Sequence, residues 1–337
     1  MTNINNFSEI EKFILEKISE NSNNVTQLTA QKFNITVQAI NRYLKKLEDK
    51  EIIKSEGNTK AKKYYLQEQK FKYTLNITPY SDENEIWKEY IKPHLTNISE
   101  NVYKICNHGS TKILNNVIDH SQSKNITIGL SINPVNISIL IRDSGIGIFE
   151  KIKTECNFKD HLEALQELVK GKLTTDSIKH SGEGIFFTSK MFDEFMVTSN
   201  KLRYLHKSEN VDCVIENQNL FTGTIILMSI KQNSIRNPQD VFKEYTTGDF
   251  AFDKTIIPVE LTQYGEDDLV SRAQAKRILA RLEKFKEIIL DFKNVNSIGQ
   301  AFADEIFRVF TNAHPHVRFI PINTNEEIDF MIKRVSA

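Results

Sequence analysis

The stretch that decides the fold is Asn136-Ile-Ser-Ile-Leu-Ile-Arg-Asp-Ser-Gly-Ile-Gly-Ile-Phe149. Isoleucines alternate with other residues at its start, which predicts a strand, and that strand ends at Asp143 followed by Gly145 and Gly147. A carboxylate in such a turn can accept a hydrogen bond from an exocyclic amino group, and glycines let the backbone pass close to a flat ligand. The alternative is an ordinary loop between two strands.

The segment before this strand, residues 110–121, has helical periodicity. Four apolar residues share one face of the predicted helix: Ile113, Leu114, Val117 and Ile118. The adjacent stripe carries Lys112, Asn116 and His120 at intervals of one helical turn. The helix therefore offers a row of polar side chains beside its apolar face.

Two further segments with glycine follow the strand. Gly182 and Gly184 stand where a helix is expected to begin, and the free amides and dipole of a helix start favour phosphate. Farther on, Gly223 and Thr224 precede a predicted strand over residues 225–230.

These motifs occur in a specific order: an asparagine on a helix, an Asp-Gly turn, a glycine pair opening a helix, and a Gly-Thr strand. In this order they resemble the nucleotide-binding ATPase fold shared by DNA gyrase, Hsp90, histidine kinases and MutL (GHKL). The resemblance covers roughly residues 86–230, and four ordered motifs are more specific than any single one. It implies a Bergerat-type α/β sandwich that binds ATP and Mg²⁺.

The resemblance also implies roles for individual residues. Asn116 matches the asparagine that holds Mg²⁺ against the phosphates, and an oxygen donor suits that ion. Asp143 matches the acceptor of the adenine amino group, and Thr224 matches a hydroxyl near adenine. The other implied contacts are Gly145 and Gly147 at the base pocket, and Gly182 and Gly184 beside the phosphates. Residues 150–181 resemble the mobile lid of this fold.

One position departs from the ATP-hydrolysing members of this family. They carry a glutamate one helical turn before the asparagine as the general base, whereas this chain has Lys112. An ammonium group cannot accept a proton at neutral pH unless its pKa is strongly lowered. We therefore expect Lys112 to attract the γ-phosphate as a point charge, so that ATP is sensed and turned over slowly. The alternative is that Lys112 points to solvent, and no catalytic residue is assigned.

His120 lies two turns after Lys112 on the same stripe. A lone histidine on a helix is usually a packed or surface residue, so we expect His120 to be neither a nucleotide contact nor a base.

The amino-terminal segment has its own pattern. Helical spacing covers residues 7–18, 26–33 and 36–50, with Thr36 as the expected N-cap of the last helix. Residues 51–66 then predict two strands around a polar glycine turn. Residues 37–48 and the strand after them resemble the winged helix-turn-helix domains of bacterial regulators.

In such a domain the second helix of the pair enters the major groove and the wing contacts phosphates. The residues that the resemblance assigns to double-stranded DNA are Gln38, Asn41, Arg42 and Lys45 on the helix, and Lys60, Lys62 and Lys63 on the wing. Winged helices also serve as dimerisation or protein-docking modules, which is the alternative. A homodimer is expected because such proteins commonly bind paired half-sites.

The carboxy-terminal segment alternates between strand and helix patterns. A polar linker is expected over 231–239, because Pro238 disfavours helix. Strands are expected over 254–261, 287–292 and 317–322, and helices over 270–285, 300–312 and 326–335. This alternation predicts a small α/β domain with a covered sheet.

Residues 288–307 resemble a STAS-like domain. Its relatives include anti-anti-sigma factors, which a kinase of the GHKL fold phosphorylates on a serine at the strand-to-helix turn. In this chain the turn carries Gly299, Gln300 and Ala301, and Ser297 is out of register. We therefore expect a docking or dimerisation platform with a protein partner.

The composition suits a globular protein and gives no global charge signal. Lysine plus arginine and aspartate plus glutamate each number 44, so neither nucleic acid nor membrane is indicated by net charge. No apolar run approaches the ~20 residues that cross a bilayer, and the start lacks the layout of a signal peptide. Three cysteines without a Cys-x-x-Cys pair predict packed thiols. We expect a cytoplasmic protein.

These features predict an α/β (α+β) multidomain protein. The expected domains are a winged helix-turn-helix over 1–72, a GHKL-type ATP-binding domain over 80–232 and a STAS-like α/β domain over 250–337. The expected function is an ATP- and Mg²⁺-binding, DNA-binding transcription regulator in which the central domain is the switch. The alternatives are an ATPase or a serine/threonine protein kinase resembling anti-sigma kinases, acting in a regulatory or defence system.

Overall fold

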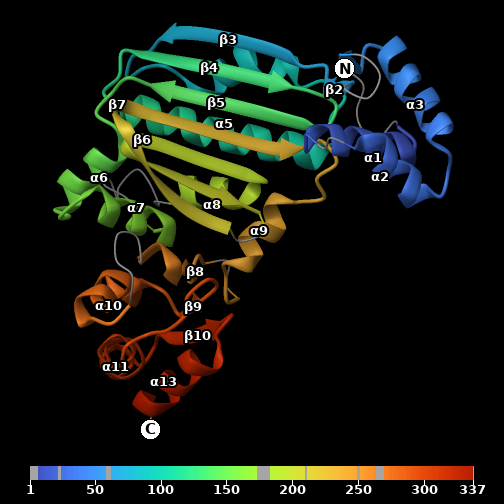
Figure 1. The fold of residues 1–337 in the computed structure, drawn as a ribbon. Coiled ribbons are helices and arrows are strands. Elements are labelled where there is room, and N and C mark those ends of the chain that lie inside the picture. The colour runs from blue at the N-terminus through green and yellow to red at the C-terminus, as the bar shows by residue number, and fades with distance from the viewer. Residues whose placement is uncertain are drawn as a thin grey trace.

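The computed structural model describes residues 7–21, 24–57, 62–172, 183–208, 211–248, 251–262 and 269–336. Figure 1 shows three parts in chain order: a small helical unit, a five-stranded sheet with helices, and a smaller α/β unit that carries the C-terminus. The α/β multidomain class expected from the sequence is confirmed.

The N-terminal unit contains three helices and a hairpin. They are α1 (Glu9–Ser19), α2 (Val25–Phe33), α3 (Val37–Asp49), β1 (Ile53–Glu56) and β2 (Lys63–Leu66), the two strands being antiparallel. The side chain of Thr36 accepts the N–H of Ala39 and caps α3, as the sequence predicts. Ser8 and Glu11 form a capping box that starts α1. The core of the unit is built from α1 and α3, with Ile14, Leu15, Ile40, Leu44 and Leu47 all buried.

The central sheet is antiparallel, in the order β3-β4-β5-β7-β6. Its strands are β3 (Gln69–Asn76), β4 (Asn125–Ile132), β5 (Asn136–Asp143), β6 (Glu194–Lys207) and β7 (Val211–Lys231). β3 begins before residue 72, where the N-terminal domain was expected to end, and pairs with β4 over its whole length. The strand predicted over 225–230 is the last part of the much longer β7.

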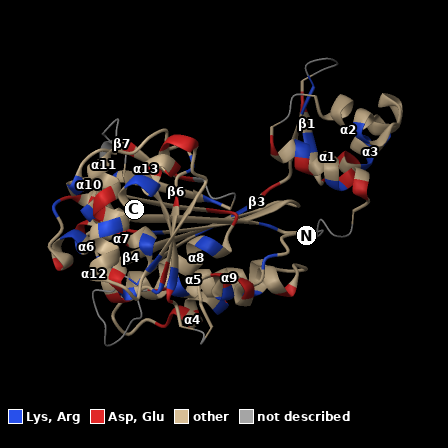
Figure 2. Cartoon of the chain, turned by 90° about the horizontal axis from the view of Figure 1, so that it is seen from below, with Lys and Arg blue, Asp and Glu red and all other residues tan. Residues whose placement is uncertain are grey.

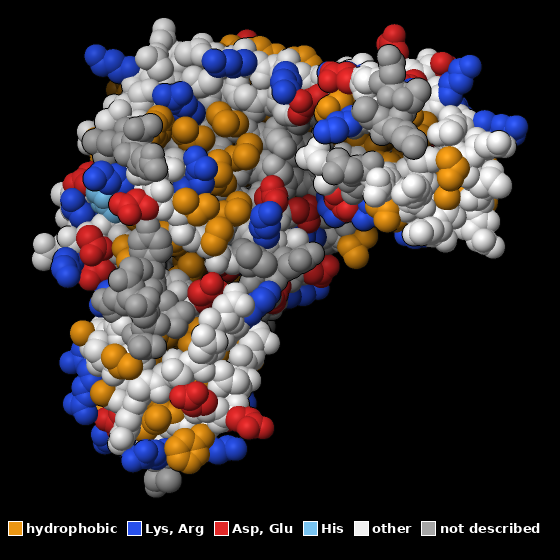
Figure 3. Space-filling view, in the orientation of Figure 1, with side chains coloured by type: hydrophobic (Ala, Val, Ile, Leu, Met, Phe, Trp, Pro, Cys, Tyr) orange, Lys and Arg blue, Asp and Glu red, His pale blue; other side chains and the backbone are white. Residues whose placement is uncertain are grey.

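One face of this sheet is covered by helices. α4 (Glu83–Ile86) and a π-helical turn (Trp87–Ile91) lead to the long α5 (Glu100–His120), and α8 (Gly184–Met191) lies beside α5. The isoleucines of β4 and β5 alternate toward these helices and are buried. The opposite face carries half-buried side chains such as Leu140 and Leu227, and Figure 3 shows hydrophobic side chains gathered there.

Three more helices lie on the side of the sheet nearer the C-terminal unit (Figure 1). They are α6 (Ile148–Cys156), α7 (His161–Lys170) and α9 (Pro238–Glu244). The expectation of a linker through Pro238 is wrong, because proline stands at the first turn of α9, where its missing N–H has no helical partner to lose. The side chain of Asn237 caps this helix.

The C-terminal unit has three parallel strands in the order β10-β9-β8. These are β8 (Lys254–Pro258), β9 (Glu287–Asp291) and β10 (Arg318–Ile322). The helices are α10 (Arg272–Leu279), α11 (Gln300–Asp304) with its π-helical continuation Glu305–Phe310, α12 (Thr311–Ala313) and α13 (Glu326–Ser336). The helix expected over 270–285 is shorter than predicted, because Arg281 takes a left-handed conformation and a 3-10 turn (Leu282–Lys284) follows.

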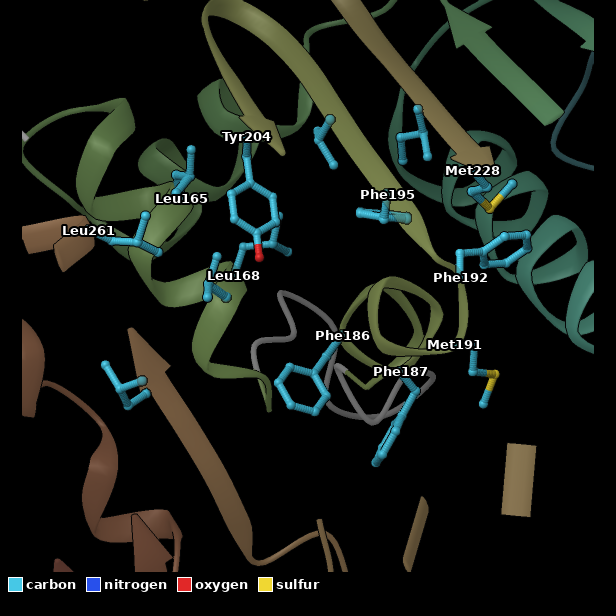
Figure 4. Packing of buried hydrophobic residues seen from close by; sticks show 14 of the residues in the cluster. Leu165, Leu168, Phe186, Phe187, Met191, Phe192, Phe195, Tyr204, Met228 and Leu261 are labelled. Carbon is cyan, nitrogen blue, oxygen red and sulfur yellow. The ribbon is translucent and has the colours of Figure 1, made fainter. Parts of the chain in front are cut away.

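The hydrophobic interior consists of two clusters among the described residues. The N-terminal unit has its own core, which also takes in Val135 from the turn between β4 and β5. The central sheet and the C-terminal unit share one continuous core, and Figure 4 shows part of it around Phe186, Tyr204 and Leu168. Within the described part of the chain, no helix is long and apolar enough to cross a membrane.

A buried polar cluster joins α8 to the hairpin of β6 and β7. The Asp212 carboxylate accepts hydrogen bonds from Tyr204 and from Nδ1 of His206 at 2.8 Å, and Nζ of Lys190 lies 3.4 Å from the same ring nitrogen. Burial would raise the pKa of Asp212, but Lys190 and these hydrogen bonds lower it to about 2.

We expect Asp212→Asn to lower the free energy of unfolding by roughly 2–3 kcal/mol at neutral pH. Because the folded-state pKa is lowered, the contribution of Asp212 is complete above its ordinary pKa of 3.8 and is lost as the pH falls toward about 2. Urea unfolding from pH 7 to pH 3 should show the difference between wild type and variant shrinking with acid. The exposed Asp240→Asn is the control, and a pH-independent difference for Asp212→Asn would contradict this assignment.

Candidate functional site

Asp143 is the last residue of β5, and it is 2% exposed. Its Oδ1 accepts the N–H of Gly145 at 2.8 Å and the N–H of Thr224 at 3.3 Å. Burial raises the pKa of Asp143, and these backbone donors act in the opposite direction. Both hydrogen bonds end on one oxygen, so neither occupies Oδ2.

The turn after Asp143 packs against the end of α5. The N–H of Ile146 donates to the carbonyl of Ser121 at 3.0 Å, and a Cβ on Gly145 would lie 1.8 Å from the same oxygen. Glycine is therefore required at position 145 by this close approach. The sequence indicated the glycine but not its neighbour Ser121.

Gly223 and Thr224 bring β7 to the same turn. Gly223 has a φ of +92°, and a Cβ there would lie 2.3 Å from the carbonyl oxygen of Asp143. The hydroxyl of Thr224 accepts the N–H of Ile148 at 3.0 Å, and Ile148 is the first residue of α6. The Thr224 oxygen thus fixes the start of α6, and a hydrogen bond from the same hydroxyl to the Asp143 carboxylate counteracts the rise in the pKa of Asp143. Gly147, with a φ of +86°, stands immediately before this helix.

The polar stripe of α5 runs away from this turn. Within the described residues, the exposed Lys112 forms no ion pair or hydrogen bond, and the half-buried amide of Asn116 has no hydrogen-bond partner. His120 differs, because Nζ of Lys151 lies 3.3 Å from both its Nδ1 and its carbonyl oxygen. Lys112 and Asn116 are consequently the two members of the stripe available to a ligand.

Gly184 begins α8 beside Lys112. A Cβ on Gly184 would meet only ordinary van der Waals contact, 3.6 Å from Cδ of Lys112. Protein packing therefore does not demand glycine at this helix start, in contrast to Gly145 and Gly223. Gly182, the other glycine of this motif, lies outside the described residues.

His108 extends the stripe by one more turn, and sequence reasoning missed it. Its Nε2 is buried without a hydrogen-bond partner among the described atoms, and its ring lies edge-on to Phe242 with centroids 5.9 Å apart. Burial, followed by the charge of Lys112, lowers the pKa of His108. Its four-residue spacing from Lys112 was the signal that could have found it.

The chemistry of these side chains is suited to binding a nucleotide together with a divalent ion. A buried carboxylate suits an amino group of a base, and an ammonium without a partner beside a helix start suits phosphate. Across the described ranges no group of three His, Cys, Asp or Glu residues could hold a metal by itself. A Mg²⁺ ion there would depend on Asn116, phosphate oxygens and water, which is its usual environment in phosphate sites.

The N-terminal unit presents a polar face on α3. Gln38, Asn41, Arg42 and Lys45 are all exposed there. On the hairpin, Lys63 is exposed, whereas Nζ of Lys62 pairs with Glu48 at 3.2 Å and lies 5.0 Å from the ring centroid of Tyr64. The assignment of Lys62 to a ligand is weakened by this pairing. Lys60 lies outside the described residues. Figure 2 shows this unit beyond one end of the central sheet.

The strand-to-helix turn of the C-terminal unit lacks a hydroxyl acceptor at the helix start. Gly299 is the N-cap of α11, Gln300 is its first residue, and no side chain caps the helix. Ser297 lies half-buried in the loop before Ile298, which forms a parallel bridge with Leu269.

Comparison with known proteins identifies one region of the chain. Residues 274–329 match the family model of the STAS-like domain of unknown function (DUF4325), so the C-terminal unit contains a STAS-like domain as the sequence resemblance implied. Among curated proteins, none matches the chain.

We expect Gly223→Ala to destabilise the protein by at least about 2 kcal/mol, because it adds both a positive-φ strain and a clash with the Asp143 carbonyl. Gly129→Ala is the matched control, since its Cβ would lie 3.5 Å from Leu140 in an ordinary contact. Chemical unfolding of both variants measures the difference. Equal free energies of unfolding for the two variants would show that β7 does not pack closely against the Asp143 turn.

Proposed function

We propose that this protein is an ATP- and Mg²⁺-binding regulator in which a GHKL-type central domain controls an N-terminal DNA-binding unit. The observation that carries the proposal is that three other segments of the chain gather around α5 and its C-terminal end. The Asp143 turn contacts the end of α5 at Ser121, Thr224 contacts that turn, and Gly184 contacts Lys112 in the middle of the helix. Asn116 lies one turn from Lys112, between the two contact points.

The positions along α5 suggest how a nucleotide would lie. The Asp143 carboxylate would accept the adenine amino group, with Gly145 and Gly147 along the base. One helical turn advances about 5.4 Å, so Asn116 and Lys112 would face successive parts of the phosphate chain. A divalent ion at Asn116 would supply charge neutralisation to the phosphates.

The side chain at position 112 distinguishes a protein that only binds ATP from one that hydrolyses it. A free ammonium group close to Gly184 attracts a terminal phosphate, but it cannot take a proton from water at neutral pH. The missing hydroxyl at the start of α11 likewise counts against phosphotransfer to this turn. Binding with slow turnover therefore agrees better with these residues than an ATPase or a kinase does.

Two observations support the DNA-binding role of the N-terminal unit. Its three helices and hairpin follow the order of a winged helix-turn-helix, and the side chains on the polar face of α3 are exposed. Exposed cationic and amide side chains on such a helix can contact phosphates and base edges. The STAS-like domain is compatible with a regulatory protein, and in this proposal it would bind a protein partner.

Asp143→Asn should weaken the binding of ATP, because the amide removes a charged acceptor from a buried site. A hydrogen bond to a charged group contributes about 1.5–3 kcal/mol, which corresponds to a loss of roughly 10- to 150-fold in affinity. Isothermal titration with ATP and Mg²⁺ measures this, with Asp240→Asn as the control for loss of a carboxylate elsewhere. Unchanged affinity in Asp143→Asn would remove this residue from the site.

Lys112→Glu should gain ATP turnover, since it places a carboxylate at the position of the general base, whereas wild type and Lys112→Met should turn ATP over slowly. Lys112→Met should also lose affinity for ATP while retaining affinity for adenosine, because only the phosphates would face the ammonium group. Phosphate release and titration with both ligands are the measurements. Rapid turnover by wild type that survives Lys112→Met would require a base elsewhere.

Arg42→Ala should weaken binding to duplex DNA and reduce the slope of log K against log salt by about 1, the effect of one lost phosphate contact. Lys17→Ala is the matched control, because Lys17 carries the same charge on α1 and pairs with Glu20. Fluorescence anisotropy with labelled duplex DNA at several salt concentrations tests this. Equal effects of the two variants would count against α3 as the binding helix.

A further inference from the structure

Helix α7 belongs to the segment that resembles the nucleotide lid, yet it packs against the C-terminal unit. All seven residues from Ala164 to Lys170 are buried. A helix that is buried on every side is enclosed by protein rather than facing solvent. Figure 4 shows Leu165 and Leu168 of α7 near Tyr204 of β6 and Leu261 of the C-terminal unit.

Lys170 is the main polar contact between α7 and the C-terminal unit. Its Nζ donates to the carbonyls of Arg277 at 2.8 Å and Ala280 at 3.1 Å, which are at the end of α10. It also pairs with Glu167, and both side chains are at most 6% exposed. A buried ammonium therefore satisfies the last carbonyls of a helix from another part of the chain, an interaction favoured by the helix dipole.

Three further hydrogen bonds secure the same interface. Nε2 of Gln166 donates to the carbonyl of Leu261 at 3.2 Å, and the hydroxyl of Thr255 donates to the carbonyl of Lys170 at 2.8 Å. Just after α7, Nζ of Lys172 donates to the carbonyl of Lys284 at 2.8 Å. The C-terminal end of α7 is therefore held by β8, α10 and the turn after α10.

The other end of α7 leads to the candidate nucleotide site. His161, its first residue, pairs with Glu150 of α6 at 2.5 Å, and α6 begins at Ile148, whose N–H is bound by Thr224. After α7 the chain returns to the site at Gly184. In sequence α7 lies between two segments of the candidate site, and in space it contacts the C-terminal unit.

We propose that α7 couples the nucleotide site to the STAS-like unit through the contact of Lys170 with the end of α10. This inference rests on the proposed function. ATP would favour the arrangement in which α7 is docked, because α6 begins directly after Gly147, assigned to the base, and α8 begins at Gly184, assigned to the phosphates. By linkage, the docked C-terminal unit in turn favours ATP.

The test compares wild type with Lys170→Met and Glu167→Met/Lys170→Met by hydrogen exchange and nucleotide titration. The double variant matters because a single change leaves the Glu167 carboxylate buried and unpaired, whereas replacing both charges by apolar side chains of similar volume is often tolerated. It also removes the donor to Arg277 and Ala280. Lys159→Met is the control, since Lys159 is an exposed lysine just before α7.

Without nucleotide, the double variant should exchange at least about fivefold faster than wild type at the end of α10 and also at the first turns of α6 and α8. Faster exchange at α10 alone, with α6 and α8 unchanged, would overturn the coupling. This comparison does not depend on whether ATP binds.

With Mg²⁺ and a non-hydrolysable ATP analogue, wild type and Lys159→Met should become protected at the end of α10. The double variant should lose this protection and bind the analogue at least about fivefold more weakly. Equal affinity and equal protection in the double variant would overturn the proposal. Failure of wild type to bind the analogue would instead overturn the proposed function, and the exchange without nucleotide would still decide the coupling.

Discussion

The structure around the candidate site depends on one interaction, the acceptance of two backbone N–H groups by the buried carboxylate of Asp143. The donors, Gly145 and Thr224, belong to segments about eighty positions apart, so a single side chain joins the turn after β5 to the middle of β7. A buried carboxylate is costly unless it is hydrogen-bonded, and these donors offset that cost. The turn lies so close to Ser121, the C-cap of α5, and to Gly223 that positions 145 and 223 both require glycine.

This constraint also relates the site to the N-terminal unit. β5 begins at Asn136, whose Nδ2 donates to the hydroxyl of Ser19 at 3.0 Å, and ends at Asp143. Val135, directly before β5, is part of the N-terminal core. An eight-residue strand spans roughly 25 Å. The candidate site and the N-terminal unit are therefore at opposite ends of one central strand, which connects the proposed switch to the proposed DNA-binding unit.

The C-terminal unit is joined to the rest in a different way. Its core is continuous with the core of the central sheet, and the buried end of α7 forms much of that junction. The N-terminal unit keeps a separate core and contacts the sheet through few groups, such as Asn233, whose Nδ2 lies 3.4 Å from Glu16. We infer that the central and C-terminal parts respond together, while the N-terminal unit retains more freedom.

The sequence by itself determined the elements that local patterns encode. The alternating isoleucines of β5, the cap at Thr36 and the helical stripe of Lys112, Asn116 and His120 were all predictable, because side-chain period and capping chemistry depend on neighbours along the chain. It also indicated the STAS-like domain at the C-terminus. Local rules were less reliable at element ends, where Pro238 begins a helix that it was expected to prevent.

Only the tertiary structure decided which groups meet. His120 lies beside Lys151, and Lys62 pairs with Glu48. Lys112 and Asn116 have no partner among the described residues. Lys170 of α7 donates hydrogen bonds to carbonyls at the end of α10. These contacts join residues that are far apart in the chain, so the periodicity of side chains along a helix or strand does not predict them. Their presence depends on burial and on the distance between elements, which are set by the packing of the whole core.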